Sequence, residues 1–287
     1  MTKVLITGVT GNVGMEVIKS LNKLSHQLDL YAGVSDLLKD QQLTGNKIKL
    51  IQFDFANTES YYSALNNIDI LFLLRPPRIA EVKKYFKPLI EIAKQNHVKH
   101  IVFLSVQGVE NSKIIPHHKI EKLIVESKIP YTFLRPAYFM QNFTTILRND
   151  LVVKQKIFLP AGNAKFTLID VRDIGAVTAC ILTNTSQHIN NSYELTSKDK
   201  LTFKEMANKL SSGLGKNIHF ESPNLIDFYL TKRKEKIPLM FILVMIMLHY
   251  FPRFQKEPKI TQWTEEILGR PSISFDQFII DNKNLLG

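Results

Sequence analysis

Three glycines near the start of the chain have the spacing and the surroundings of a phosphate-binding loop. Gly8, Gly11 and Gly14 directly follow the apolar run Lys3–Thr7 and open the amphipathic run Val13–Leu24. Between a strand and a helix, the first glycine permits the tight turn, the second lets a pyrophosphate approach the backbone, and the third lets the helix pack closely on the sheet. The N–H groups at the helix start then favour a phosphate. We therefore expect a dinucleotide to bind here. The other residues assigned to this loop are Thr10, Asn12 and Val13.

The elements that must position this loop follow from a regular alternation in the first half of the chain. The expected strands are apolar runs at Lys3–Thr7, Leu28–Val34, Ile48–Phe53, Ile68–Leu74, His100–Ser105 and Tyr131–Arg135. The expected helices are amphipathic stretches at Val13–Leu24, Ala80–Asn96 and Lys119–Ser127. Strands that are apolar throughout are typical of a sheet with helices on both faces. The predicted fold class is therefore α/β, with a doubly wound parallel sheet.

The alternation ends near Pro136, which indicates a second, smaller lobe that is mainly helical. Shorter elements are expected there, namely strands at Ile157–Pro160, Ala164–Leu168 and Ser192–Thr196 and a helix at Val171–Leu182. Thr202, with Glu205 three residues later, has the capping-box pattern of a further helix start. We therefore divide the chain into a nucleotide-binding domain, 1–135, and a mainly substrate-binding lobe, 136–287, with about 167–197 returning to the first domain.

Composition excludes several classes of protein. Of the 287 residues, 45% are hydrophobic and 22% are charged, which is typical of a folded globular protein rather than a disordered one. The single cysteine, Cys180, excludes a disulfide framework and a zinc site built on several thiolates, and no metal site is expected. The sequence begins directly with a strand pattern and without a signal-peptide pattern, so we expect a cytoplasmic protein.

The net charge of +11 and the apolar run Leu239–Leu248 bear on the possible partners. The basic residues are spread along the chain without a recognition motif, so a solvated surface is favoured and no nucleic-acid partner is expected. The apolar run is well short of the roughly 20 residues that a membrane span needs, so no membrane is expected. Its methionines, Met240, Met245 and Met247, fit an adaptable pocket wall. A buried helix or an oligomer contact fits the same run.

Two motifs resemble those of a known group of proteins. The spacing Gly8-x-x-Gly11-x-x-Gly14 is similar to that of the short-chain dehydrogenase/reductase superfamily. The run Tyr131–Asn142, YTFLRPAYFMQN, resembles one in the NmrA-like branch of its atypical members, and Phe166–Ile174 and Tyr193–Thr196 extend the resemblance to about Gly215. The resemblance implies a Rossmann domain with a C-terminal substrate lobe, and binding of NAD(P)H.

The same resemblance places further residues around the cofactor. It implies that Asp54 and Phe55, at the end of the third strand, lie near the adenine, although Asp54 also suits a simple strand-end turn. It implies that the tips of the fourth and fifth strands lie along the cofactor, through Leu73, Leu74 and Ser105. These residues complete the expected cofactor site.

The preference between NAD and NADP is set at the ribose 2′ position, near the end of the second strand. The proteins that this chain resembles often carry an arginine at the position that Ser35 occupies here, so the strongest NADP signal is missing. Asp36 suits either a ribose hydroxyl or a turn cap, and Lys39 suits a 2′-phosphate. The sequence leaves the choice open.

The helix after the fifth strand lacks the tyrosine–lysine pair of typical short-chain dehydrogenases, because it reads PHHKIEK over Pro116–Lys122. Two pairs one helical turn apart remain, His117 with Glu121 and His118 with Lys122. The resemblance favours the first pair, in which Glu121 supports His117. That imidazole would orient a substrate carbonyl and donate a proton near neutral pH. An exposed helix start is the alternative interpretation.

The substrate is expected beyond the C-terminal edge of the sheet, where ligands bind in open α/β folds. The residues assigned to it are Ala137, Tyr138, Phe139 and Asn142. The resemblance implies an NAD(P)H-dependent oxidoreductase that reduces a quinone, an azo compound or a similar electron-poor small molecule by hydride transfer. A cofactor-sensing regulator with a protein partner is the main alternative. A nucleotide-sugar epimerase is a third, but its chemistry depends on the missing tyrosine–lysine pair. A homo-oligomer is compatible with the sequence.

Overall fold

The computed structural model describes residues 1–38 and 48–287, in which the chain forms two compact units. The first unit consists of Met1–Ala137, Val171–Leu195 and Gln262–Pro271. The second unit consists of Tyr138–Asp170, Thr196–Thr261 and Ser272–Gly287. Lys39, one candidate for reading the ribose 2′ position, lies outside the described residues. The sequence contains no evident signal for the return of Gln262–Pro271 to the first unit.

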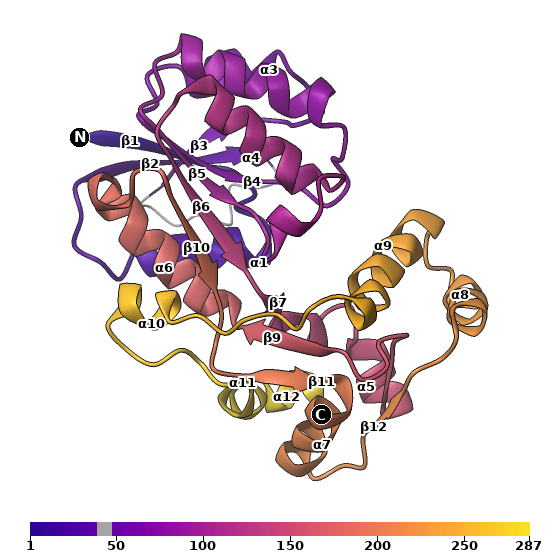
Figure 1. The fold of residues 1–287 in the computed structure, drawn as a ribbon. Coiled ribbons are helices and arrows are strands. Elements are labelled where there is room, and N and C mark those ends of the chain that lie inside the picture. The colour runs from indigo at the N-terminus through magenta and orange to yellow at the C-terminus, as the bar shows by residue number, and fades with distance from the viewer. Residues whose placement is uncertain (39–47) are drawn as a thin grey trace. The chain divides into compact units, whose positions relative to one another are not determined.

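A parallel sheet of seven strands forms the centre of the first unit (Figure 1). Its strands are β1 (Thr2–Ile6), β2 (Leu28–Val34), β3 (Lys49–Gln52), β4 (Ile70–Leu74), β5 (His100–Leu104), β6 (Tyr131–Pro136) and β10 (Asn191–Leu195). They lie in the order β10-β6-β5-β4-β1-β2-β3, and every neighbouring pair is parallel. The predicted doubly wound parallel sheet is therefore confirmed.

Helices cover both faces of this sheet. They are α1 (Asn12–Leu21), α2 (Ser60–Leu65), α3 (Val82–Gln95), α4 (Pro116–Ser127), α6 (Val171–Thr183) and α10 (Trp263–Leu268), with 3-10 turns η3 (Val109–Asn111) and η5 (Thr185–His188). Figure 1 shows α1 and α6 together on one face and α3 and α4 on the other. Close packing of α1 on α6 requires Gly175, because a Cβ there would lie 2.6 Å from the backbone of Glu16. This double cover explains why all five residues of β5 are buried.

The strand order fixes where a ligand can bind in this unit. From β1 the chain proceeds through β2 to β3 on one side, and it then returns to build β4, β5 and β6 on the other side. The strand order therefore reverses between β1 and β4. In open α/β sheets such a switch point opens a crevice at the carboxyl ends of the strands, and ligands bind there.

The second unit contains smaller sheets and most of the C-terminal helices. Its strands are β7 (Tyr138–Phe139), β8 (Lys156–Phe158), β9 (Lys165–Ile169), β11 (Lys200–Thr202) and β12 (His219–Glu221), which form the sheets β11-β9-β7 and β12-β8. Its helices are α5 (Arg148–Lys154), α7 (Phe203–Leu214), α8 (Leu225–Lys234), α9 (Leu239–His249), α11 (Phe275–Asp281) and α12 (Lys283–Leu286), with 3-10 turns η4 (Met140–Phe143) and η6 (Phe251–Phe254).

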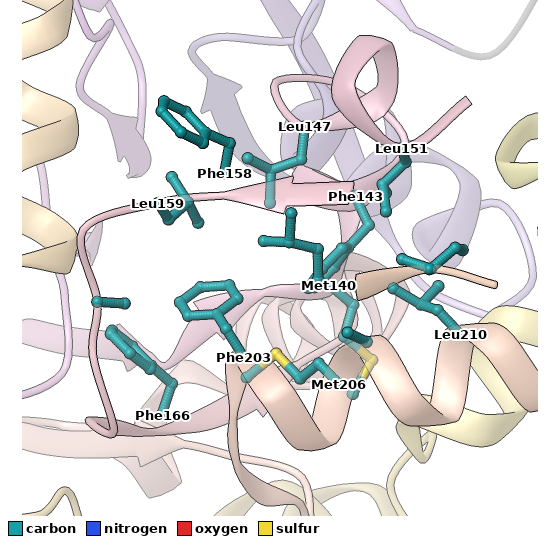
Figure 2. Packing of buried hydrophobic residues seen from close by; sticks show 14 of the residues in the cluster. Met140, Phe143, Leu147, Leu151, Phe158, Leu159, Phe166, Phe203, Met206 and Leu210 are labelled. Atoms are coloured by element: carbon teal, nitrogen blue, oxygen red, sulfur yellow. The ribbon is translucent and has the colours of Figure 1, made fainter. Parts of the chain in front are cut away.

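An aromatic core of its own holds the second unit together (Figure 2). Phe143, Phe166 and Phe203 pack with Met140 and Met206, and Phe166 and Phe203 have ring centroids 5.0 Å apart. The predicted capping box at α7 is present, because the Thr202 hydroxyl and the Glu205 carboxylate bond each other's backbone N–H groups. A capping box satisfies two backbone donors at the helix start.

The apolar run near the C-terminus forms α9, and only part of it is buried. Ile242, Met245 and His249 point into the core, whereas most of the remaining side chains are exposed. The interpretation as a simple buried helix is therefore wrong. Within the described ranges, no helix is both long enough and apolar enough to cross a membrane.

Candidate functional site

The loop between β1 and α1 lies directly at the switch point of the sheet. The Thr7 hydroxyl donates a hydrogen bond to the carbonyl of Phe72 (3.1 Å) and accepts one from the N–H of Leu74 (2.9 Å), which ties the ends of β1 and β4 together. Gly8 follows with a φ of +66°, and a Cβ there would meet the Leu74 side chain at 2.9 Å. Only glycine accepts both the left-handed backbone and the close neighbour.

The other two glycines of the loop differ in what constrains them. A Cβ at Gly14 would lie 2.3 Å from the carbonyl oxygen of Gly8, so this position requires glycine for packing. Gly11 is exposed, and a Cβ there would meet only that same oxygen at 3.4 Å, with no other contact within 4 Å. The protein itself therefore leaves space beside Gly11. This is the position at which a dinucleotide fold brings the pyrophosphate against the backbone.

The start of α1 is free to bind an anion. Gly11 is its N-cap, and no side chain caps the helix. Thr10 and Asn12 are exposed beside it, whereas Val13 is buried and contributes packing and its backbone N–H. Uncapped N–H groups and the positive end of the helix dipole favour a phosphate at this point. The residues present therefore fit a dinucleotide.

The end of β2 offers no cation among the described residues. Ser35 is exposed, and its carbonyl accepts a hydrogen bond from the Gln52 amide (2.7 Å). The Asp36 carboxylate accepts one from the N–H of Leu38 (3.0 Å), which is the turn-cap role that the sequence left open. This geometry does not choose between NAD and NADP.

Asp54 and Phe55 have clear structural roles at the end of β3. The Asp54 carboxylate accepts a hydrogen bond from the N–H of Ala56 (2.8 Å) and so shapes the strand-end turn. The Phe55 side chain is buried, with its ring centroid 4.9 Å from that of Phe53. The expected position of Asp54 and Phe55 near the adenine stays a prediction.

The C-terminal ends of β4 and β5 carry a buried leucine and a serine whose hydroxyl lacks a hydrogen-bond partner. Leu73 is fully buried and Leu74 is half-buried against Gly8. At the end of β5, the Ser105 hydroxyl is buried and has no hydrogen-bond partner among the described residues. A buried hydroxyl without a partner is costly, so it is a reason to expect a ligand or a water there. Ser105 therefore fits its predicted place beside a cofactor.

His117 lies in the first turn of α4, beside a residue that the sequence did not point to. The Arg75 Nε donates a long hydrogen bond of 3.4 Å to the His117 Nε2, and the Phe103 ring lies 6.1 Å away between centroids. The Arg75 guanidinium is itself held by the carbonyls of Pro76 and Ile79, at 3.0 and 2.9 Å. Burial, and then the charge of Arg75, lowers the pKa of His117 to about 3.

This pKa bears on one expected role of His117. An imidazole with so low a pKa is neutral at pH 7, which argues against the expectation that it donates a proton near neutral pH. Because Nε2 accepts the hydrogen bond from Arg75, the ring proton is assigned to Nδ1. The neutral ring then retains one N–H donor, which suits hydrogen bonding to a substrate carbonyl.

Glu121 does not support His117, contrary to expectation. Its two carboxylate oxygens accept hydrogen bonds from Arg135 Nε and Nη2, at 3.0 and 2.7 Å. A guanidinium matches a carboxylate in this bidentate geometry, and it therefore outcompetes an imidazole one turn away. Glu121 thus joins α4 to the end of β6.

The second register, His118 with Lys122, shows no direct pairing either. The His118 Nδ1 lies 3.3 Å from the carbonyl oxygen of Val109, to which it donates when protonated. Lys122 is exposed and forms an ion pair of 3.7 Å with Glu126 on the same helix. Among the four residues proposed for catalysis, His117 and Glu121 each contact a partly buried arginine, which is Arg75 for His117 and Arg135 for Glu121.

The candidate substrate residues divide between the two units. Ala137 ends a segment of the first unit and is buried, whereas Tyr138, Phe139 and Asn142 belong to the second. The Tyr138 hydroxyl lies 3.1 Å from the Nε2 of His249, and the ring packs edge-on against Phe166 and Phe203. Phe139 and Asn142 are half-buried. Their contact with a substrate stays a prediction.

The sequence comparison decides the family. The sequence model of the NmrA-like family matches residues 1–252. This chain belongs to the NmrA-like family. The expected resemblance is thereby confirmed, and the matched region extends beyond Gly215, to which the motifs alone reached.

Several known proteins are similar to this chain over most of its length. Prestalk A differentiation protein A of Dictyostelium discoideum is 29% identical over 96% of this chain and 90% of its own length. The NAD(P)H azoreductase of Xenophilus azovorans is 28% identical over 76% of each chain. The structure of an NADPH-dependent quinone oxidoreductase of Escherichia coli with NADPH superposes with a TM-score of 0.86, at 22% identity, over 96% of this chain and 98% of that one.

Sequence reasoning missed two residues that contact candidate site residues, Arg75 beside His117 and His249 beside Tyr138. Arg75 follows β4 in the run Arg75–Arg78, RPPR, and its position after a switch-point strand was the signal that could have identified it. His249 ends the apolar run of α9, and the signal was a lone polar residue at the spacing of the buried Ile242 and Met245. Both contacts join residues far apart in the chain, so the partner of each residue could not be predicted from local spacing.

Proposed function

We propose that this chain reduces flat, electron-poor small molecules, such as quinones or azo compounds, with NAD(P)H as the reductant. The observation that carries the proposal is the loop at the switch point, where Gly11 leaves open space beside an uncapped helix. An NAD(P)H-dependent oxidoreductase is the coarser conclusion, and the family and the named relatives support it. When bound, this cofactor supplies a hydride.

The residues of this chain favour a substrate that needs little acid catalysis. His117 is neutral, so it orients a carbonyl oxygen by a hydrogen bond rather than by delivering a proton. A quinone fits this limitation because hydride addition gives a stabilised phenolate, which takes its proton from water. An alcohol dehydrogenation or an epimerisation needs a base at the hydroxyl, and the tyrosine for that role is absent from α4.

A substrate panel tests this proposal. The purified protein is mixed with NADPH or NADH and with a quinone, an azo dye or a nucleotide sugar, and oxidation of the cofactor is followed against a blank without protein. We expect turnover with the quinone or the azo dye and none with the sugar. Turnover confined to the nucleotide sugar would contradict the proposal.

A regulator that senses the cofactor is the second candidate. It is favoured by the similarity to a relative that is named for differentiation rather than for a reaction. Tight NAD(P)H binding without oxidation by any member of the panel would support this candidate. It would also require a protein partner that recognises only one occupancy state.

A further inference from the structure

One side of α9 is an exposed apolar surface, which we call the α9 face. Its residues are Leu239, Met240, Leu243, Val244, Met247 and Leu248 of α9, together with Phe251 at the start of η6, and each is at least 40% exposed. The opposite side of the helix, with Ile242, Met245 and His249, is buried in the core of the second unit. A helix that is apolar all round is normally buried. In α9, by contrast, the side chains on one side of the helix are exposed to solvent.

The α9 face continues onto the next turn of chain. In η6, Phe254 is 70% exposed, and its ring centroid lies 5.3 Å from that of Tyr250. Exposed apolar patches of this extent on soluble proteins mark interaction sites. The surface combines aromatic rings with aliphatic side chains, the mixture found on helices that lie in the membrane interface.

Basic side chains lie at both ends of the α9 face. Arg233, Lys234 and Lys236 precede α9 and are exposed. Lys256 follows η6 and is exposed, and the guanidinium of Arg253 lies 5.0 Å from the Tyr250 ring centroid. None of these five cations forms an ion pair with a described residue.

Two of the acidic residues near this surface are paired with lysines. Glu235 accepts hydrogen bonds from Lys154 and, at 2.8 Å, from Lys232. Glu257 forms ion pairs with Lys165 (3.2 Å) and Lys200 (2.9 Å). The Asp227 carboxylate accepts a hydrogen bond from the neutral Asn224 amide (2.7 Å) and keeps its charge. The five cations therefore leave an excess of positive charge at the ends of the α9 face.

We propose that the α9 face docks the protein on an anionic lipid surface. The apolar side chains would enter the boundary between head groups and acyl chains, and the cations would contact the anionic head groups. The sequence argument against a membrane was that the apolar run is too short to span one. A helix that lies in the membrane interface does not need the roughly 20 residues of a span, so the 11 residues of α9 are sufficient. A second copy fits less well, because a symmetric pair would bring two basic surfaces together.

Binding to lipid vesicles tests the proposal directly. The full chain is sedimented with vesicles of phosphatidylcholine alone or with added phosphatidylglycerol, at low and high salt. We expect binding to the anionic vesicles, little binding to the neutral ones, and weaker binding at high salt because the charges are screened. This measurement needs neither cofactor nor turnover, so its result is independent of the proposed reaction.

Two double variants separate the apolar and the charged contributions. Leu243→Glu with Met247→Glu puts charge on the α9 face and should abolish binding. Lys234→Glu with Lys236→Glu should lower the partition coefficient by about tenfold or more. The matched controls are Ile280→Glu with Leu285→Glu, exposed apolar residues of the same unit, and Lys83→Glu with Lys204→Glu. Both controls should bind like the unchanged protein.

Three results would overturn the proposal. The first is no binding to anionic vesicles, and the second is equal loss in the test variants and their controls. The third is a dimer, seen by sedimentation velocity without lipid, that Leu243→Glu with Met247→Glu converts to a monomer. That result would assign the α9 face to a second copy of this chain.

Discussion

The imidazole of His117 and the guanidinium of Arg75 are in contact, and we expect the two groups to act together in the proposed site. The cation helps to keep the ring neutral, and the ring nitrogen satisfies the Nε of a half-buried arginine. A neutral imidazole is a hydrogen-bond donor of moderate strength that does not have to lose a proton to bind. We expect such a donor to position a substrate carbonyl with little dependence on pH above neutrality.

Replacing His117 with alanine should lower turnover with a quinone by about tenfold or more, because the donor at the substrate carbonyl is removed. The NADPH dissociation constant should change little. The matched variant is His118→Ala on the same turn, which loses only a contact with a backbone carbonyl and should have the smaller effect. Steady-state kinetics and fluorescence titration measure the two quantities. A larger loss in His118→Ala would instead favour the His118–Lys122 register.

Ser35→Arg should shift cofactor preference toward NADPH. The position is exposed at the end of β2, and an arginine there adds a charge-assisted contact to a 2′-phosphate. We expect the unchanged protein to discriminate weakly and the variant to bind NADPH at least about tenfold more tightly than NADH. Ser35→Gln is the uncharged control. Strong NADPH preference in the unchanged protein would mean that another cation already reads the phosphate.

Element by element, the sequence predicts best where a local pattern sets the structure. The glycine spacing and the apolar runs were sufficient for β1 and α1, and the spacing of Thr202 and Glu205 was sufficient for the capping box of α7, because turns, caps and burial act over a few residues. The pairing of Glu121 was predicted wrongly because its partner, Arg135, lies 14 residues away on another element. Helical spacing identifies the possible neighbours of a residue, but it cannot rank them against a partner brought close by the fold.

Helices α5 and α8 are joined by an ion-pair network that was also not predicted from the sequence. Lys232 is buried and donates to Asp150 at 2.6 Å, and Lys154 donates to the same carboxylate at 2.7 Å. Burial alone would raise the pKa of Asp150, but hydrogen bonds from both lysines outweigh it and hold that pKa below its usual range. The two lysines lie far apart in sequence, so no pattern predicted the network.

Asp150→Asn should destabilise the second unit by about 3 kcal/mol, because it leaves the buried Lys232 charge with Glu235 alone. Denaturant unfolding measures the change in free energy. The control is Glu91→Gln, which removes an exposed pair with Lys87 (3.8 Å) and should cost less than about 0.5 kcal/mol. Similar costs for the two variants would show that the buried network contributes no more than a surface pair.

Considered as a whole molecule, the protein holds three histidines in neutral form, of which His100 and His249 are buried and His117 is half-buried. Burial lowers the pKa of His100 and of His249 to about 4, and that of His117 to about 3, from an ordinary value of 6.5. The unfolded chain therefore binds more protons than the folded one below pH 6.5. The free energy of unfolding is therefore not reduced by these histidines above pH 6.5, and it falls as the pH drops toward 4.

We expect the free energy of unfolding to fall by at most about 1.4 kcal/mol per pH unit for each of these histidines below pH 6.5. Denaturant unfolding at about pH 7.5, 6 and 5, on both sides of the ordinary pKa of histidine, measures the slope. His100→Asn should flatten the slope, whereas His219→Asn, at an exposed strand position, should leave it unchanged. A slope that does not respond to His100→Asn would contradict the assignment.

The fold class and the family were predictable from the sequence because they depend on a run of independent local signals over the matched region. The exposed state of α9 was not, because an apolar run is compatible with a core, an interface or a lipid surface, and only the fold shows which side it buries. Likewise, the sequence identified Tyr138 as a candidate but could not show that its hydroxyl faces His249. Such contacts depend on the packing of the second unit.

The most direct test of the central claim is quinone-dependent oxidation of NADPH by the unchanged protein beside Gly11→Asp. Gly11 has room for a side chain in the protein alone, so the variant should fold with an unchanged unfolding midpoint. Its carboxylate would occupy the approach of the pyrophosphate and repel its charge. We predict turnover in the unchanged protein and loss of both turnover and calorimetric NADPH binding in the variant. Equal turnover by the two proteins, or none by the unchanged protein with NADPH bound, would contradict the claim.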